Sequence, residues 1–282
     1  MSKNLAIIAG RGLLPRELAN GASRSGQKPF LIGIEDEVEP WLSEFDHEIL
    51  GWGQFGKLFS VLEQRNIGQV VLAGSVTRPK IKIAKMDWGA IRSLPQVLAF
   101  MIGGDNSLLS GVINLFESRG IEVVGAHEIL PDLLVEKGPI VGRTPPKKAL
   151  TNISKAVEAA KELGRLDIGQ AAVAVGGRVV AVEGIEGTDG MLERVELMRR
   201  NGRLFENGRY GVLVKTMKPD QEMRVDLPAI GPDTINRLAE AGLRGVGVEA
   251  GQSFILDREK TLKLARFHEV FIYGLDPGNG VS

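Results

Sequence analysis

Short, continuous apolar runs alternate with segments of helical period through the first half of this 282-residue chain. Strands that are buried on both faces have such uninterrupted runs, whereas half-exposed strands alternate apolar and polar residues. The pattern predicts a Rossmann-like domain in which helices cover both faces of a parallel sheet. The expected strands are Leu5–Ala9, Phe30–Ile34, Gln69–Ala73 and Ile121–Gly125, and the expected helices are Leu14–Ser25, Gln54–Arg65 and Leu108–Ser118.

The second half of the chain has a different texture. Residues 135–150 are rich in proline, glycine and charge, which is typical of a linker. We therefore predict an α/β protein with a Rossmann-like parallel-sheet domain over residues 1–134, a linker over 135–150 and a C-terminal mixed α/β domain over 151–282. The topology of the second domain is left open. Its expected helices are Ser154–Leu163, Met191–Asn201 and Thr234–Ala241, its expected strands Gly211–Lys215 and Val270–Gly274, with a hairpin of Ala171–Val175 and Val179–Val182 around Gly176-Gly177.

Composition excludes several classes of protein. The chain has 35 basic and 35 acidic residues, so the basic excess of a nucleic-acid-binding protein is missing. There is no cysteine, which rules out disulfides, thiolate metal sites and a thiol nucleophile. Neither a signal peptide nor a transmembrane segment is apparent, so we expect a cytoplasmic protein. Peripheral contact with a membrane surface and a homodimer are both left open.

Glycine-rich turns follow two of the expected strands in the first half. Gly10 and Gly12 lie between a strand and a helix, where backbone N–H groups and a helix N-terminus favour an anion. The dinucleotide fingerprint requires Gly or Ala at position 15, but Pro15 stands there. A phosphate-bearing ligand and a plain tight turn are about equally compatible with this segment.

The other two loops of the first half are weaker signals. Residues 73–79, with Gly74, Val76 and Thr77, follow a strand at the edge where ligands of parallel sheets bind, although an ordinary turn would look the same. Asp105 precedes a helix and is more simply an N-cap than a ligand contact. These loops gain weight because all of them fall at junctions between elements.

The densest polar cluster of the chain is Lys215–Pro228, which gathers three cations, three acids, an amide and two prolines. The prolines predict an extended, stiff loop. Cations beside a carboxylate suit phosphoryl transfer, because cations stabilise charge on phosphate oxygens while the carboxylate holds Mg²⁺ or positions a water. Asp226 is singled out because alternation would turn it away from its apolar neighbours. A merely solvated charged loop is the alternative.

Seven motifs in fixed order resemble the UDP-2,3-diacylglucosamine pyrophosphatases of lipid A biosynthesis, the type unrelated to the metallophosphatase-fold enzymes. The match spans nearly the whole chain. The motifs lie in residues 9–15, 54–57, 73–79, 125–128, 164–170, 186–189 and 224–228. The Asp-x-His and Gly-Asn-His metal motifs of the metallophosphatase type do not occur.

The resemblance implies Mg²⁺-dependent hydrolysis of the acylated UDP-sugar to UMP and 2,3-diacylglucosamine 1-phosphate (lipid X), with water attacking the β-phosphorus. Asp226 matches the essential aspartate of the family, and whether it holds the metal or acts as a base is open. The implied substrate-binding residues are Gly10, Gly12, Gly74, Val76, Thr77, Asp105, Gln170, Thr188, Asp189, Lys215, Lys218 and Gln221.

Two other functions remain compatible with the residues alone. The Gly10-x-Gly12 turn and Glu35, which could hydrogen-bond a ribose, are compatible with an NAD(P)-dependent oxidoreductase, although Pro15 argues against it. A non-catalytic nucleotide-binding module would use the same loops. It would bind UDP compounds without turning them over.

Overall fold

The computed structural model describes residues 3–76, 105–204, 211–219 and 221–277. The chain divides into two compact units, which are described separately. Unit 1 consists of Met1–Asp132 together with Glu222–Asp226, and unit 2 consists of Leu133–Gln221 and Leu227–Ser282. A short segment from late in the sequence is therefore part of the first unit.

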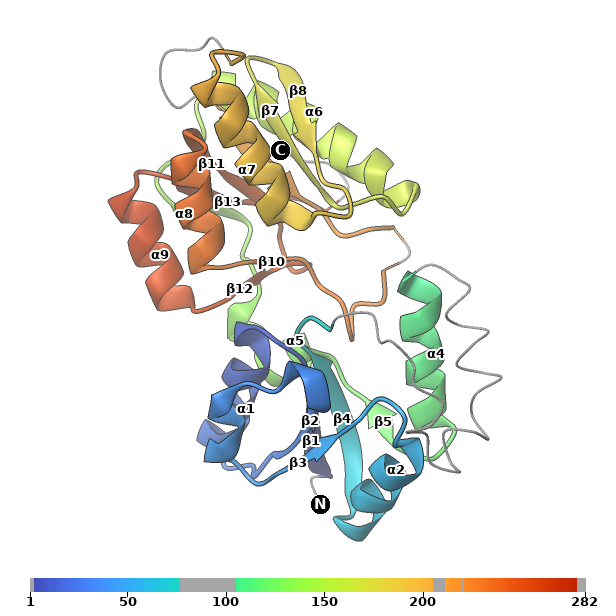
Figure 1. Cartoon of the computed structure of the whole chain (residues 1–282). Coiled ribbons are helices and arrows are strands. Elements are labelled where there is room, and N and C mark those ends of the chain that lie inside the picture. Colours follow the sequence, from blue (N-terminus) through green and yellow to red (C-terminus); the bar gives the residue numbers. More distant parts are fainter. Residues whose placement is uncertain (1–2, 77–104, 205–210, 220, 278–282) are drawn as a thin grey trace. The chain divides into compact units, whose positions relative to one another are not determined.

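The described part of unit 1 is built on a parallel sheet with the strand order β3-β2-β1-β4-β5 (Figure 1). This order reverses between β1 and β4, as in doubly wound folds, whose ligands bind beyond the carboxyl ends of the strands at that reversal. The strands are β1 (Asn4–Ala9), β2 (Phe30–Ile34), β3 (His47–Leu50), β4 (Ile67–Ala73) and β5 (Glu122–Val123). The predicted Rossmann-like sheet is confirmed.

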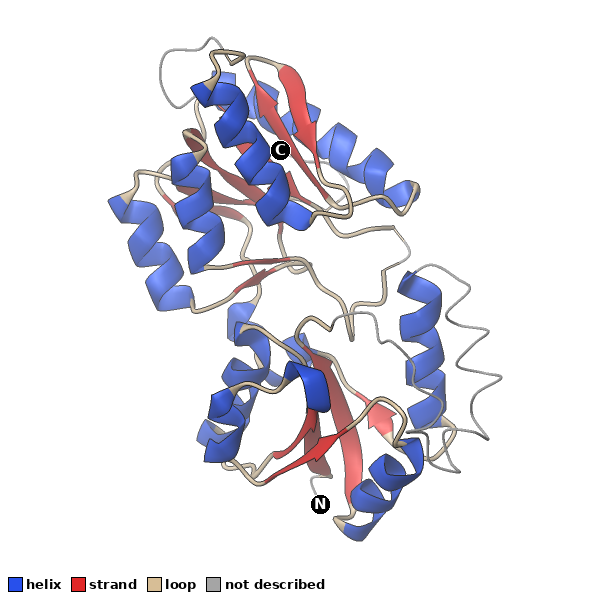
Figure 2. Ribbon diagram, in the orientation of Figure 1, coloured by secondary structure: helices blue, strands red, loops and turns tan. Residues whose placement is uncertain are grey.

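Helices lie on both faces of this sheet (Figure 2). Alternate strand residues such as Ala6 and Val70 pack with Leu62 of α2 and Phe116 of α4, while Leu18 of α1 is buried outside that cluster. The helical segments are α1 (Leu13–Arg24), α2 (Phe55–Gln64), α4 (Asp105–Glu117) and α5 (Ala126–Ile129), with the 3-10 turns η1 (Glu35–Glu37), η2 (Pro40–Glu44) and η4 (Pro131–Leu133).

The described part of unit 2 has a mixed sheet with the order β6-β13-β11-β9-β7-β8 and a separate parallel pair, β10 and β12. Strands β9, β11 and β13 are parallel, whereas β6, β7 and β8 run antiparallel to their neighbours. The predicted mixed α/β fold is confirmed. The strands are β6 (Gly138–Val141), β7 (Ala171–Val175), β8 (Arg178–Val182), β9 (Gly211–Lys215), β10 (Ala229–Ile230), β11 (Leu243–Glu249), β12 (Phe254–Ile255) and β13 (Phe271–Leu275).

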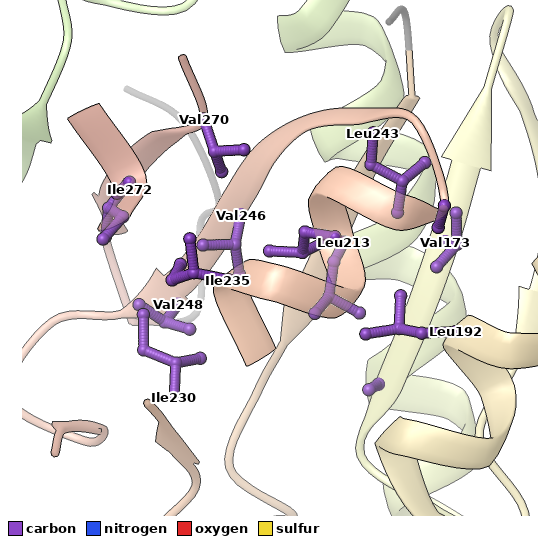
Figure 3. Close-up of a cluster of buried hydrophobic side chains, with 14 of the residues drawn as sticks. Val173, Leu192, Leu213, Ile230, Ile235, Leu243, Val246, Val248, Val270 and Ile272 are labelled. Atoms are coloured by element: carbon purple, nitrogen blue, oxygen red, sulfur yellow. The ribbon is translucent and has the colours of Figure 1, made fainter. Parts of the chain in front are cut away.

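Two hydrophobic clusters cover the two faces of the unit 2 sheet. Val173 and Leu213 point toward α7, α8 and α9, where they pack with Leu192 and Ile235 (Figure 3). The alternate residues of the same strands pack against α6. Fully buried strands with helices on both faces explain why β7 and β9 read as continuous apolar runs. The helices are α6 (Lys147–Arg165), α7 (Gly187–Arg200), α8 (Pro232–Glu240) and α9 (Arg258–Phe267).

The segment 135–150, which we interpret as a linker from its composition, contains regular structure. Residues 138–141 form β6 at the sheet edge, and α6 begins at Lys147. Pro139 is compatible with a strand there because an edge strand has one row of N–H groups that need no partner. The predicted hairpin is confirmed, with Gly176 and Gly177 both at positive φ as a type I′ turn requires. Among the described helices, none has the length and apolar character needed to cross a bilayer.

Candidate active site

The carboxyl edge of the unit 1 sheet is shaped by two glycines that touch through their backbones. Gly10 follows β1 and Gly74 follows β4, and Arg11 and Ser75 extend the pairing by two reciprocal backbone hydrogen bonds of 2.8 and 2.9 Å. A Cβ on Gly10 would come within 2.4 Å of the Ser75 carbonyl oxygen, and one on Gly74 within 2.6 Å of that of Arg11. Only glycine fits either position.

The N-terminus of α1 already holds a carboxylate. The N–H of Gly12, whose φ is +102°, donates to Glu39 Oε1 at 2.8 Å, and Trp41 Nε1 donates to Glu39 Oε2 at 2.9 Å. The N–H groups of Gly10 and Arg11 donate to β4 and its turn. A phosphate that used the Gly12 N–H would therefore have to displace Glu39, a competition that the glycine spacing did not reveal.

The remaining N-terminal positions are only partly described. Val76 is exposed, and Asp105 is the first residue of α4. Thr77 and the Asp105 side chain lie outside the described residues. Glu35 begins η1 beside Gly51, and Pro15 is buried in the first turn of α1, where it packs next to Gly74. Pro15 thus occupies the close packing position that a dinucleotide-binding turn leaves to a small residue.

Asp226, the predicted catalytic residue, is half-buried and belongs to unit 1. Its N–H and that of Val225 both donate to the Glu222 carbonyl oxygen at 3.1 Å. The chain therefore turns here, rather than alternating sides as an extended loop would. Arg224 binds the Glu222 carboxylate, and this hydrogen bonding lowers the Glu222 pKa and raises the Arg224 pKa.

The carboxyl edge of the unit 2 sheet contains buried side chains instead. Lys215, the last residue of β9, is buried, and its Nζ donates to the Ala229 carbonyl at 3.0 Å. The next residue, Thr216, donates its N–H to the Gln170 carbonyl at 2.9 Å. Because β7 runs antiparallel to β9, Gln170 at the start of β7 lies at the same edge as Lys215.

The loop after β9 adds a second cation to this edge. Lys218 Nζ lies 2.7 Å from Asp167 Oδ1. The Lys218 N–H donates to Oε1 of the buried Gln221 at 2.9 Å. Glu249, at the end of β11, accepts the Met217 N–H at 2.8 Å. The structure thus brings Lys215, Lys218 and Gln221 to one end of the sheet.

Thr188 and Asp189 begin α7 but face different partners. Thr188 Oγ1 donates to Glu183 Oε1 at 2.6 Å, and Glu183 Oε2 accepts the Gln170 N–H at 2.9 Å, so Thr188 is connected to the edge. Asp189 lies 3.4 Å from Arg237 of α8. The structure therefore groups Thr188 with Gln170 and gives Asp189 a contact on the helical layer.

Gln170 Oε1, Thr216 Oγ1 and Ser253 Oγ are among the buried side-chain atoms of unit 2 that have no hydrogen-bond partner in the described part of the chain. Native proteins rarely leave such atoms unsatisfied, so each calls for a water or a ligand. Gln170 was among the expected binding residues, whereas Thr216 and Ser253 were not. No spacing marks them, because a lone hydroxyl after a strand looks the same as an ordinary turn residue.

Acidic and imidazole groups do not gather into a metal cage in the described residues, where no group of three or more His, Asp or Glu could hold an ion. His127 is of interest because its Nδ1 is buried without a hydrogen-bond partner and because its charge contributes to lowering the Glu222 pKa. Its ring lies so close to Gly125 that an added Cβ there would meet Cε1 at 2.3 Å. Glu128 caps α5 by accepting the Gly125 N–H at 2.7 Å.

Two family models together match almost the entire chain. The LpxI N-terminal domain matches residues 4–133, and the LpxI C-terminal domain matches residues 136–273. The chain belongs to the LpxI family. A curated LpxI relative, the UDP-2,3-diacylglucosamine pyrophosphatase of Caulobacter vibrioides, is 39% identical over 275 residues, which cover 98% of each chain.

Two solved structures are weakly similar to this LpxI chain. A CobK precorrin-6A reductase is 12% identical with a TM-score of 0.33, covering 100% of this chain and 90% of its own. A GalE-like L-threonine dehydrogenase from Cupriavidus necator is also 12% identical with a TM-score of 0.33, covering 98% of this chain and 86% of its own. At these scores neither similarity carries an argument about fold or function.

Proposed function

We propose that this LpxI protein hydrolyses the pyrophosphate bond of UDP-2,3-diacylglucosamine in lipid A biosynthesis, releasing UMP and 2,3-diacylglucosamine 1-phosphate (lipid X). The observation that carries the proposal is the 39% identity, over 98% of both chains, to a curated UDP-2,3-diacylglucosamine pyrophosphatase. The cations and open polar atoms at the carboxyl edge of the unit 2 sheet support an anionic, oxygen-rich ligand.

The proposed reaction is attack of water on the β-phosphorus. The water oxygen forms a bond to that phosphorus, and the bond from the phosphorus to the bridging oxygen breaks, so that the bridging oxygen leaves on UMP. The water gives up a proton, which a carboxylate can accept. Asp226 is the proposed group that binds or deprotonates this water. Lys215 and Lys218 are proposed to bind the phosphate oxygens and stabilise the charge that develops on them.

Asp226 also fits the expected Mg²⁺. This ion commonly takes one or two protein carboxylates and completes its shell with phosphate oxygens and waters, so the lack of a larger acidic cluster in the described residues does not conflict with it. When bound, Mg²⁺ neutralises charge on the diphosphate. The proposed protein ligand is Asp226, because it matches the essential aspartate to which the family resemblance points.

Turnover in ¹⁸O-labelled water tests both the activity and the point of attack. The purified protein, UDP-2,3-diacylglucosamine and Mg²⁺ should give UMP without label and lipid X with one labelled oxygen, as read by mass spectrometry. Label in UMP would move the attack to the α-phosphorus. No UMP under any divalent cation would overturn the proposed function, and unchanged turnover in excess EDTA would remove Mg²⁺ from it.

We further propose that the protein works in the cytoplasm at the surface of the inner membrane. The substrate carries two acyl chains, and each buried methylene favours a bilayer by about 0.8 kcal/mol. Flotation with anionic vesicles, with and without substrate analogue, tests this association.

Sedimentation velocity tests whether the protein forms a homodimer.

The oxidoreductase alternative is not favoured. Both family models belong to LpxI, and the relative with this substrate in its name aligns over nearly the whole chain. Pro15 fills the position where a dinucleotide-binding turn has a small residue. Saturable binding of NADPH would revive the alternative. Binding of UDP compounds without turnover would favour a nucleotide-binding module.

A further inference from the structure

Asp226, the residue proposed to act on the substrate, lies in a five-residue segment that belongs to a different unit from its neighbours in sequence. Glu222–Asp226 belong to unit 1, although the residues on either side, Gln221 and Leu227, belong to unit 2. Such a short segment has no helix or strand of its own to hold it in place. Its position must therefore depend on the side chains and backbone groups that tie it to unit 1.

Arg224 ties the segment to Glu117 and also braces the turn within the segment through Glu222. Its Nε and Nη2 donate to Oε1 and Oε2 of Glu222 at 3.0 and 2.9 Å, and its Nη1 donates to Oε1 of Glu117 at 2.7 Å. The guanidinium is a rigid planar fork, so binding two carboxylates at once fixes its orientation as well as its place. Glu117 is the last residue of α4, so the segment is tied to a helix that packs on the unit 1 sheet.

The residues beside Arg224 secure the same turn. The Val225 side chain packs against the hydrophobic cluster that contains Ile113 and Phe116 of α4. The Glu222 carbonyl accepts the N–H groups of both Val225 and Asp226 at 3.1 Å. Asp226 is therefore two residues from the bound guanidinium and one residue from a side chain packed on the core.

The electrostatics favour this arrangement. An acidic side chain at a helix C-terminus is unfavourable because the helix dipole is negative there, and the last turn of α4 has no basic residue. The guanidinium supplies the missing positive charge for Glu117. Its hydrogen bonds also lower the pKa of Glu222, which extends to more acidic pH the range in which that carboxylate stays charged and bound.

We propose that Glu117, Arg224 and Glu222 form a clamp that positions Asp226, and that all three are positioning residues for the hydrolysis. The inference rests on the proposed function, in which Asp226 acts on the substrate. Partly exposed ion pairs of this kind contribute little to global stability, so holding the fold is a poor account of the clamp. Reactions are far more sensitive, since a displacement of about 1 Å can cost on the order of 10² in rate.

The kinetic test is a double-mutant cycle of Glu117→Gln and Arg224→Gln. We expect kcat to fall on the order of tenfold in Glu117→Gln and 100-fold in Arg224→Gln, with KM within twofold of the wild type. Because Glu117 acts through Arg224, the double variant should be no slower than Arg224→Gln alone. Arg224→Lys keeps the charge without the fork and should be intermediate. Unchanged kcat in Arg224→Gln, or a fully multiplicative double variant, would overturn the clamp.

Glu122→Gln is the matched control, because Glu122 is in the same unit and its 2.9 Å ion pair and its side-chain hydrogen bonds go to Lys3 and Gln69. It should leave kcat and KM unchanged. A tenfold loss in this control as well would show that any lost ion pair slows the enzyme, and would overturn a specific role for Glu117.

Hydrogen exchange tests the clamp without using activity. The amides of Val225 and Asp226 should exchange at least tenfold faster in Arg224→Gln than in the wild type, and should be unchanged in Glu122→Gln. Equal protection in all three proteins would overturn the clamp even if activity were lost. Failure of the proposed function shows separately, as an absence of UMP release by the wild-type protein.

Discussion

The carboxyl edges of the two sheets satisfy their polar groups in different ways. In unit 1 the edge consists of backbone: Gly10 and Gly74 touch, and the nearby N–H groups donate to protein oxygens, including the Glu39 carboxylate. In unit 2 the edge consists of side chains, with Lys215 buried and Thr216 Oγ1 unsatisfied. Among the described residues, the first edge is shaped by close backbone contacts, whereas the second has a buried cation and polar atoms without a hydrogen-bond partner.

Because of this difference, we expect substitutions at the two edges to have different first effects, one on folding and the other on ligand binding. A change at the unit 1 edge should act first on folding, because backbone contacts leave no room for a larger residue. A change at the unit 2 edge should act first on the ligand, because Gln170 Oε1 and Thr216 Oγ1 have no hydrogen-bond partner among the described residues. Asp226 belongs to unit 1, where Arg224 and Val225 secure its turn, so replacing Asp226 should act mainly on the rate of the reaction.

The largest effect is expected for Asp226→Asn, which keeps the size of the side chain and removes its charge. We expect kcat to fall by at least about 10³, or roughly 4 kcal/mol in barrier, while the urea midpoint changes little. Steady-state kinetics measures kcat, and urea unfolding measures the midpoint. A loss of less than about tenfold would remove Asp226 from the centre of the chemistry.

The next effect is on the fold and compares two glycines of unit 1. Gly74→Ala places a Cβ against the Arg11 carbonyl at a φ of +89°, whereas Gly26→Ala has a similar φ of +82° but open space around it. We expect a loss of about 1 kcal/mol for Gly26→Ala from the backbone conformation and about 3 kcal/mol for Gly74→Ala from conformation and overlap together. Urea unfolding monitored by circular dichroism checks this difference, and equal losses would contradict the close backbone packing.

At the unit 2 edge, Lys218→Met should weaken substrate binding by about tenfold, because a buried cation contact to phosphate is lost while the aliphatic stem is kept. The side chain is 13% exposed and pairs with Asp167, so the effect also includes the unpaired carboxylate. Lys155→Met is the control, since Lys155 pairs with Glu158 within α6. A similar rise of KM in both variants would argue that only the net charge matters.

The smallest effect is expected for Thr216→Val, which should change ligand binding but not stability, in contrast to Thr261→Val. Removing a buried hydroxyl that has no partner should leave the melting temperature unchanged or slightly raised, yet raise KM about fivefold if the hydroxyl binds the ligand. Thr261→Val should do the opposite, because the Thr261 hydroxyl donates to the Leu256 carbonyl at 2.6 Å. It should cost about 1 kcal/mol in stability without a change in KM.

Much of the fold follows from local sequence. Strand β2 has the predicted bounds, and the paired glycines mark the β7–β8 hairpin because few other residues adopt positive φ. Strand β11 is not apparent in the sequence because Gly245 and Gly247 reduce its apolar character. Gly245 is required by packing, since a Cβ there would overlap Phe271 of β13. This requirement comes from β13, which is distant in sequence, so the residues of β11 alone do not reveal it.

The candidate site is less accessible from sequence for the same reason. Composition indicates Lys215–Pro228 as a polar loop, and the family resemblance indicates Asp226. Neither reveals that Glu222–Asp226 belong to unit 1, because the contacts that place them involve Glu117 and the core around Phe116, more than 100 positions earlier. The partners of buried polar atoms are likewise set by tertiary structure and leave no periodic signal.

Because residues 222–226 belong to unit 1, this unit cannot complete its folding early in translation. Arg224 follows its partner Glu117 by 107 positions, which a ribosome covers in roughly 5 to 20 s. During that interval the nascent first unit has a helix end without its counter-charge and a core without Val225. A chain interrupted anywhere before residue 222 would lack the aspartate altogether, so the catalytic machinery we propose is assembled only after most of the protein has been synthesised.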